Sequence, residues 1–268
     1  MMTISKRLTL IALLLAVLFL SLELAQGAGP AARPIVDYLP KSQLYRVAII
    51  TPAGAEEYVY QVEFRVDADT SQLLASTLGP GYTMESRYDA DLRLLNSEMV
   101  VLTSEDAARV GFDRRVAAYD AVEEKYVVFY YLEGTVQDSR EVVIKEQATE
   151  IEVLGLHLQA LLNAGRTDFS GSLLDLNAPG RMQLDTRVLT DKQVRDLSGK
   201  RDVAPQIKAI LEKTDQVTVF TIGYDGILRF FFPTRFYVIL EKAAPHRILA
   251  YWAGSGERLR YVLYQFLE

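Results

Sequence analysis

The sequence contains no cysteine. Without cysteine the chain forms no disulfide bond, so side-chain packing rather than covalent cross-linking must stabilise the fold. The same absence excludes a lipid-modified cysteine at the N-terminus of an exported chain. Half of the residues are apolar and 24% are charged, which is typical of a globular protein that buries a substantial core.

Histidine is almost absent, since the chain has only His157 and His246. A zinc site needs three or four nitrogen, sulfur or oxygen ligands, and neither histidine belongs to an HxH or HxxxH pattern. We therefore predict no metal site and no cofactor. His157 lies beside an apolar stripe, which favours a packed position, whereas His246 follows Pro245 in an expected turn and is predicted to be exposed.

Motifs for covalent or acid–base chemistry are missing as well. The serine-glycine stretches 170–172 and 254–256 do not complete G-x-S-x-G and are interpreted as loops. The adjacent glutamates at 56–57 and 123–124 would point to opposite faces of a strand, so they would not converge on a substrate. The sequence predicts a protein that is not an enzyme. A hydrolase assembled from distant residues is kept as an alternative.

Basic residues are fewer than acidic ones, which gives a formal net charge of −6. Neutralisation of phosphates dominates nucleic-acid affinity, so a mildly acidic chain without basic blocks is not expected to bind nucleic acid. The same charge argues against simple adhesion to anionic lipid.

The first 27 residues have the organisation of a secretory signal peptide. Lys6 and Arg7 precede an apolar stretch at 8–22, and small residues at 25 and 27 form a cleavage site near Gly27. The apolar stretch is shorter than the roughly 20 residues that a spanning helix needs, although an uncleaved anchor helix is the alternative. We expect a periplasmic or secreted protein with no integral membrane span after cleavage.

The remaining chain is expected to form an extended leader at 28–43 and a single β-rich domain at 44–268. Apolar and polar residues alternate in several stretches, as in strands with one face on a core. A polar turn is expected at 137–139, between two of these strands. Strands are predicted at 60–67, 84–95, 125–132, 140–145, 181–188, 217–222, 247–252 and 258–267.

One helix is predicted at 150–164, where leucines recur at helical spacing. Thr149 and Glu152 have the spacing of a capping box at its start, and Gly165 is suited to a left-handed cap at its end. Residues 203–213 fit either a short helix that begins at Pro205 or a strand. The predicted fold class is mainly β: a curved antiparallel sheet or half-open barrel with one or two helices.

The segment LRFFFPTRFYVIL at 228–240 is apolar on both faces, and Pro233 marks a bulge, break or edge because it lacks a backbone donor. A transmembrane barrel would show one apolar and one polar face, which argues against that alternative. The sequence resembles periplasmic lipoprotein carriers and related envelope proteins. The features that carry this resemblance are the signal peptide, a hairpin at Gly226, Pro233 and the stretch 245–252. The resemblance implies a half-open barrel with a helix in its mouth.

The most direct functional hypothesis is a binding protein for an apolar or amphipathic envelope ligand, such as a lipid or lipoprotein. The alternative is a structural or assembly factor of the envelope, whose sheet edge pairs with another envelope protein. Aromatic and leucine side chains from the helix and the C-terminal strands are the candidate ligand contacts: Leu154, Leu158, Phe230, Phe232, Phe236, Tyr237 and Trp252.

Overall fold

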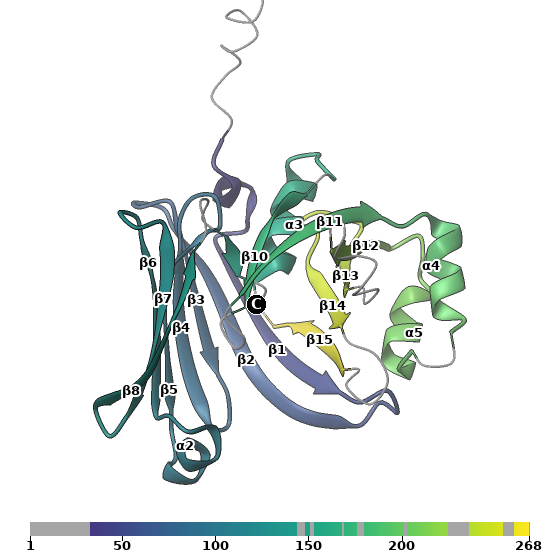
Figure 1. Ribbon diagram of the computed structural model, residues 1–268. Helices are drawn as coiled ribbons and strands as arrows, with labels where there is room; N and C mark the ends of the chain where they lie inside the picture. The colour runs from purple at the N-terminus through teal and green to yellow at the C-terminus, as the bar shows by residue number, and fades with distance from the viewer. Residues whose placement is uncertain are drawn as a thin grey trace, which may run out of the picture. The chain divides into compact units, whose positions relative to one another are not determined.

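The protein is represented by a computed structural model (Figure 1). It describes residues 33–267 apart from 144–147, 151–152, 168, 176–179, 201–202, 225–235 and 254–259. Residues 34–268 belong to one compact unit. None of the helices in the described part of the chain combines the length and hydropathy that a membrane span requires.

Most of the described chain is β-strand. The strands are β1 (Ser42–Ile50), β2 (Glu56–Asp67), β3 (Gln72–Leu78), β4 (Tyr82–Tyr88), β5 (Leu94–Val101), β6 (Arg114–Asp120), β7 (Lys125–Leu132), β8 (Thr135–Val143), β9 (Thr149–Glu150), β10 (Ser170–Asp175), β11 (Gly180–Val188), β12 (Val217–Tyr224), β13 (Phe236–Glu241), β14 (Ile248–Ala253) and β15 (Arg260–Phe266). The helices are a 3-10 turn η1 (Ile35–Tyr38) and the α-helices α2 (Ser104–Val110), α3 (Leu154–Asn163), α4 (Asp191–Ser198) and α5 (Pro205–Leu211).

Within the described residues, the strands form one 15-stranded sheet in the order β8-β7-β6-β5-β4-β3-β2-β1-β15-β14-β13-β12-β11-β10-β9. Hairpins connect most sequential neighbours, so the pairs are antiparallel, except that β9 and β10 pair in parallel. The sheet is curved (Figure 1). The long strands β1 and β2 lie between its two parts, which are the strands β3–β8 and the strands β9–β15. The mainly β fold class and the curved antiparallel sheet are therefore confirmed.

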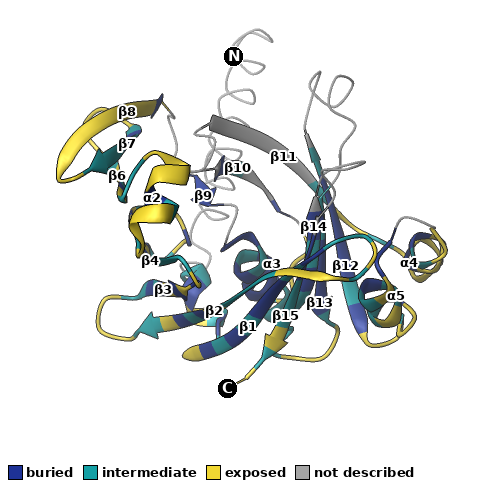
Figure 2. Ribbon diagram, turned by 90° about the horizontal axis from the view of Figure 1, so that it is seen from below, coloured by how far each residue is buried: buried dark blue, intermediate teal, exposed yellow. Residues whose placement is uncertain are grey.

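The two faces of the sheet carry separate cores. On the inner face, α3 belongs to one buried cluster together with residues from both parts of the sheet, including Tyr45, Phe64, Tyr126 and Phe220. On the outer face of β12–β15 and β1, apolar side chains of α4 and α5 cover a second cluster. Successive side chains along a strand point to opposite faces of the sheet, so neighbouring residues belong to different cores. Figure 2 shows α3 as a mostly buried helix, whereas β8 and α2 are largely exposed.

A hydrogen-bonded network holds α3 against the sheet. Gln159 is fully buried, and its side-chain amide exchanges hydrogen bonds of 3.0 and 3.2 Å with the amide of Gln43 in β1. The Gln159 Nε2 also donates to the Pro245 carbonyl oxygen at 2.8 Å. One turn later, Asn163 Nδ2 donates to the Tyr38 carbonyl oxygen at 2.9 Å. Since buried polar groups are costly when unpaired, these bonds fix the position of the helix.

The start of α3 differs from the prediction. Its N-terminal cap is Val153, which makes no side-chain capping bond, and Thr149 belongs to β9, so the predicted capping box is wrong. Pairing of β9 with β10 places Thr149 in the sheet, which removes it from the helix end. The predicted left-handed position at Gly165 is confirmed by its φ of 72°, and the Gly165 N–H donates to the Leu162 carbonyl oxygen at 2.9 Å.

The other α-helices either decide between two predicted alternatives or were not predicted. The stretch 203–213 contains helix α5, with Pro205 in its first turn, so the helical alternative is correct. Neither α2 nor α4 was predicted. In α4 the side chains of Thr190 and Gln193 form a true capping box. Helices α2 and α4 have only 7 and 8 residues, so each gives too few apolar repeats to be recognised from the sequence.

Two expected strand boundaries are wrong. The stretch 84–95 is two strands, because the Asp89 carboxylate accepts from the backbone N–H groups of Asp91 and Arg93, each at 2.9 Å, and closes a turn. The expected polar turn at 137–139 lies inside β8. The chain instead turns at Glu133 and Gly134, whose φ values are 52° and 76°. An edge strand in water tolerates polar residues, so polarity alone was misleading there.

Candidate functional site

The residues predicted to bind a ligand do not form one site. Leu154 and Leu158 are buried in the inner core, and Phe236 packs against the same core. Tyr237 and Trp252 belong to the outer cluster instead, where their rings stack with centroids 4.6 Å apart. Phe230 and Phe232 lie outside the described residues.

Strand geometry explains this division. Tyr237 follows Phe236 directly, so the two side chains point to opposite faces of β13. Tyr237 is also the register partner of Trp252 in β14, which places both rings on the face that α4 and α5 cover. Trp252 is only 4% exposed. These two residues therefore stabilise the outer core and do not face the interior of the curved sheet.

A cavity of about 250 Å³ lies on the inner face and is the stronger candidate for a binding site. It lies between β2–β4 on one side and β1, β14 and β15 on the other, with the start of α3 contributing Val153. Six of its lining side chains are aromatic. The lining is Ile49, Tyr60, Val62, Phe64, Ala75, Thr77, Tyr82, Met84, Tyr88, Val153, Tyr251 and Tyr264.

Alternation along the strands brings these side chains together. In β4, Tyr82, Met84 and Tyr88 point inward, while Glu85 and Arg87 are exposed. Thr77 of β3 is the register partner of Met84, so their side chains share this face. The sequence pattern placed Met84 and Tyr88 on one apolar face. It could not show that this face borders a cavity, because that depends on β14 and β15 packing opposite it.

The cavity wall carries few groups suited to catalysis. The Tyr88 hydroxyl donates to Glu150 Oε2 at 2.5 Å, and Glu150 is 1% exposed. Met84 Sδ accepts from the buried Arg115 guanidinium at 3.5 Å. The remaining lining combines rings, aliphatic groups and a thioether with the hydroxyl groups of the tyrosines and Thr77. Such a mixed lining suits an amphipathic ligand, because the rings can pack on its apolar part and the hydroxyl groups can bind its polar part.

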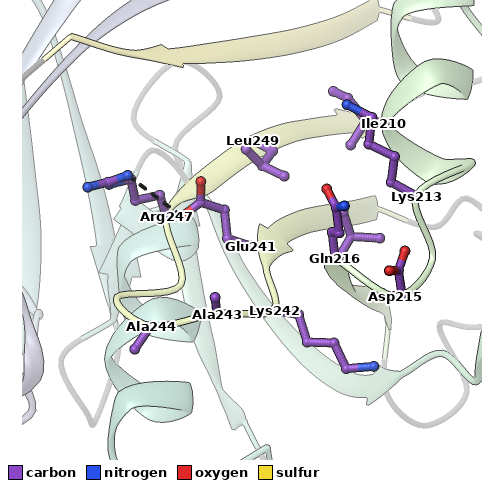
Figure 3. A pocket seen from close by; sticks show the side chains of 11 residues that line it. Ile210, Lys213, Asp215, Gln216, Glu241, Lys242, Ala243, Ala244, Arg247 and Leu249 are labelled. Atoms are coloured by element: carbon purple, nitrogen blue, oxygen red, sulfur yellow. Dashed lines mark ion pairs between the residues drawn. The ribbon is translucent and has the colours of Figure 1, made fainter.

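A second, open cleft of about 800 Å³ lies on the surface between the end of α5 and the β13–β14 connection (Figure 3). Glu241 and Arg247 point toward one another across 4.0 Å. Lys213, Asp215 and Lys242 also lie along its wall. Charges of both signs share this open surface, where water solvates them, so they add little attraction for a ligand.

The histidines occupy structural positions. His157 Nδ1 lies 3.4 Å from Thr149 Oγ1, and its ring meets Phe169 edge to face with centroids 4.8 Å apart. Burial, with smaller contributions from the charges of Arg166 and Arg93, lowers the pKa of His157 to about 4. The expectation that His157 is packed is thus correct.

The expectation that His246 is exposed is wrong, because the residue is half-buried and its Nδ1 lies 3.0 Å from the Glu241 carbonyl oxygen. Ser170 begins β10, so the predicted loop at 170–172 is also wrong; the loop at 254–256 lies outside the described residues. Within the described residues, no three His, Asp or Glu side chains gather as metal ligands. Of the adjacent glutamates, Glu56 forms an ion pair with Arg46 and Glu123 forms one with Lys125.

Comparisons with known proteins add no functional assignment. No protein-family model matches the chain, and no curated protein matches it, so no enzyme family is identified. Among solved structures, the chain is similar to a beta-barrel-like protein of domain of unknown function DUF1849 from Brucella abortus, with a TM-score of 0.43 and 13% identity over 85% of this chain and 95% of that one. The DNA polymerase III subunit beta from Borrelia burgdorferi aligns with a TM-score of 0.15 and 7% identity over 84% of this chain and 56% of that one. Likenesses this weak carry no argument about function.

Proposed function

We propose that this protein binds an apolar or amphipathic ligand inside its curved sheet and carries or holds it without covalent chemistry. The supporting observation is the inner cavity, where six aromatic side chains and Met84 line a space of about 250 Å³. The organisation of residues 1–27 supports an exported protein, so the ligand would come from the cell envelope. The resemblance to lipoprotein carriers supports the same class of ligand.

The binding energy would come from burial of apolar surface. Each square ångström removed from water contributes about 25 cal/mol, before the cost of ordering the ligand. The aromatic wall is well suited to this role because its rings are already held by the sheet. Tyr264, for example, packs against Tyr45 and Tyr251 with centroid distances of 5.6 and 6.1 Å.

The proposal is tested by filling the cavity. Ala75 is 6% exposed and lines the cavity, so Ala75→Leu places a larger side chain in the ligand space. Its neighbour Ser76 is exposed on the opposite face of β3, and Ser76→Leu is the matched control. We expect Ala75→Leu to weaken binding of the fluorescent fatty acid cis-parinaric acid by about tenfold or more, which corresponds to about 1.4 kcal/mol.

The control has to retain the affinity of the unchanged protein, and circular dichroism has to show that both variants are folded. Overpacking costs about 1–3 kcal/mol, so thermal unfolding is recorded for each. Native mass spectrometry of the mature protein provides an independent measurement, with co-purified lipid as the expected result. Absence of saturable probe binding by the unchanged protein, together with lipid-free mass spectra, would refute the proposal.

A second candidate function is assembly with an envelope protein through β8. This strand pairs with β7 at one end of the sheet order, and nearly all of it is exposed. A partner strand could extend the sheet there. Asp138, Arg140 and Glu141 place charges on the strand, a feature that usually protects edges from pairing, so we rank this function second. Cross-linking in intact envelopes tests it, and a protein that captures no partner through β8 would exclude it.

A further inference from the structure

The inner cavity has a neighbour on the same face of the sheet. An open recess of about 340 Å³ lies beside α2 and is lined by residues of β2, β4, β5 and the β3–β4 turn. Tyr82 lines both the recess and the cavity. The lining of the recess is Tyr58, Pro80, Gly81, Tyr82, Met99, Val101, Asp106, Arg109 and Val110.

Register pairing shows that the recess continues the cavity wall. Val101 is the partner of Tyr82, and Met99 is the partner of Met84, so these four side chains share the inner face. Tyr58 also faces inward, and its ring stacks on Tyr82 with an interplanar angle of 8° and centroids 6.4 Å apart. A continuous apolar and aromatic surface therefore runs from α2 into the cavity, with Tyr82 at the boundary.

The β3–β4 turn contacts the rings of Tyr58 and Tyr82 through a glycine. A Cβ atom on Gly79 would come within 2.7 Å of the Tyr58 hydroxyl and 2.8 Å of Tyr82 Cε1. The two rings thus lie directly on glycine backbone. The Leu102 N–H donates to the Gly81 carbonyl oxygen at 2.9 Å, which anchors the chain that leads into α2. Because the backbone on both sides of Tyr82 is held, a passage between the recess and the cavity requires rotation of the Tyr82 side chain.

Size and charge point to the kind of ligand. Ligand pockets usually measure about 300–1,000 Å³, so the cavity by itself falls just below the range and the cavity with the recess falls within it. The recess is apolar along Pro80, Val101 and Val110. At its solvent side Asp106 and Arg109 form an ion pair of 2.9 Å, and the Arg109 side chain is 75% exposed.

We propose that the recess and the cavity are two parts of one elongated site for a single-chain amphiphile, and that Tyr82 is the gate between them. The hydrocarbon tail enters beside α2, passes Tyr82 and occupies the cavity. The polar head stays in the recess beside Asp106 and Arg109. This inference rests on the proposed function, because it names the access route and the ligand class of the same cavity.

The absence of cysteine makes a direct test possible, since one introduced cysteine is the only site of thiol labelling. Val110→Cys places the thiol in the recess, where Val110 is 44% exposed. Val122→Cys is the control, because Val122 is 92% exposed in the β6–β7 turn and lines neither space. Each variant is coupled to a polyethylene glycol maleimide, and uptake of cis-parinaric acid is followed by stopped-flow fluorescence before and after labelling.

Labelling at position 110 is expected to slow uptake by about tenfold or more, and labelling at position 122 is expected to leave the rate unchanged. A Tyr82→Ala variant, checked for folding by circular dichroism, is expected to release the probe faster because the gate is removed. Equal rates for both labelled proteins, with normal binding, would overturn the entry route beside α2, and an unchanged release rate in Tyr82→Ala would overturn the gate; either result leaves the cavity as the binding site. Absence of binding in the unchanged protein would instead remove the proposed function itself.

Discussion

Acid should destabilise this protein through His157 in particular. The ring lies between Thr149 of β9 and Phe169, and its pKa is lowered from 6.5 to about 4, chiefly by burial. Between these two pH values the unfolded chain binds a proton at this residue and the folded chain does not. Stability is therefore complete above about pH 6.5 and falls as the pH decreases toward 4.

The size of the effect follows from the shift. One pKa unit corresponds to about 1.4 kcal/mol, so the drop from 6.5 to about 4 gives about 3 kcal/mol as an upper value, since some solvent reaches the ring. His157→Gln removes the titrating group and keeps a polar atom near Thr149. Urea unfolding at pH 7 and pH 4, followed by circular dichroism, measures the free energy of unfolding of both proteins.

The unchanged protein should lose up to about 3 kcal/mol more than His157→Gln over this pH interval. Contributions from the carboxyl groups are common to both proteins and cancel in the difference. His246→Gln leaves His157 in place and should therefore retain the His157 contribution. Equal acid losses in the unchanged protein and His157→Gln would refute the reasoning.

Two further changes test the packing on each face of the sheet. Gly155→Ala would normally stabilise a helix by about 1 kcal/mol. Here the new Cβ would lie 2.8 Å from Ile248 Cδ1, so we expect the melting temperature of the protein to fall. The double variant Gly155→Ala, Ile248→Val lacks that methyl group and should recover the melting temperature. Trp252 is the sole tryptophan and belongs to the outer core, so its fluorescence should change little when a ligand fills the inner cavity; a large spectral shift on saturation would contradict the assignment of Trp252 to the outer face.

Sequence patterns gave correct predictions for features that depend only on residues close together in the chain. Alternation in 60–67 and 181–188 predicted strands that lie within β2 and β11, and the leucine stripe predicted α3. Gly165 was assigned correctly because a positive φ is a local property of one residue. The capping pattern at Thr149 gave a wrong prediction because strand pairing with distant residues overrode it.

The amino-acid sequence by itself determined the mainly β class, the inner helix and the need for a core without disulfides, since periodicity and composition act through near neighbours. Only the tertiary structure decided which apolar face packs solid and which borders a cavity. Phe236 and Tyr237 are adjacent in the chain and enter different cores, and Tyr82 meets Tyr58 across strands of the folded sheet. The physical reason is that a cavity is the space left between elements far apart in the sequence, so no single stretch encodes it.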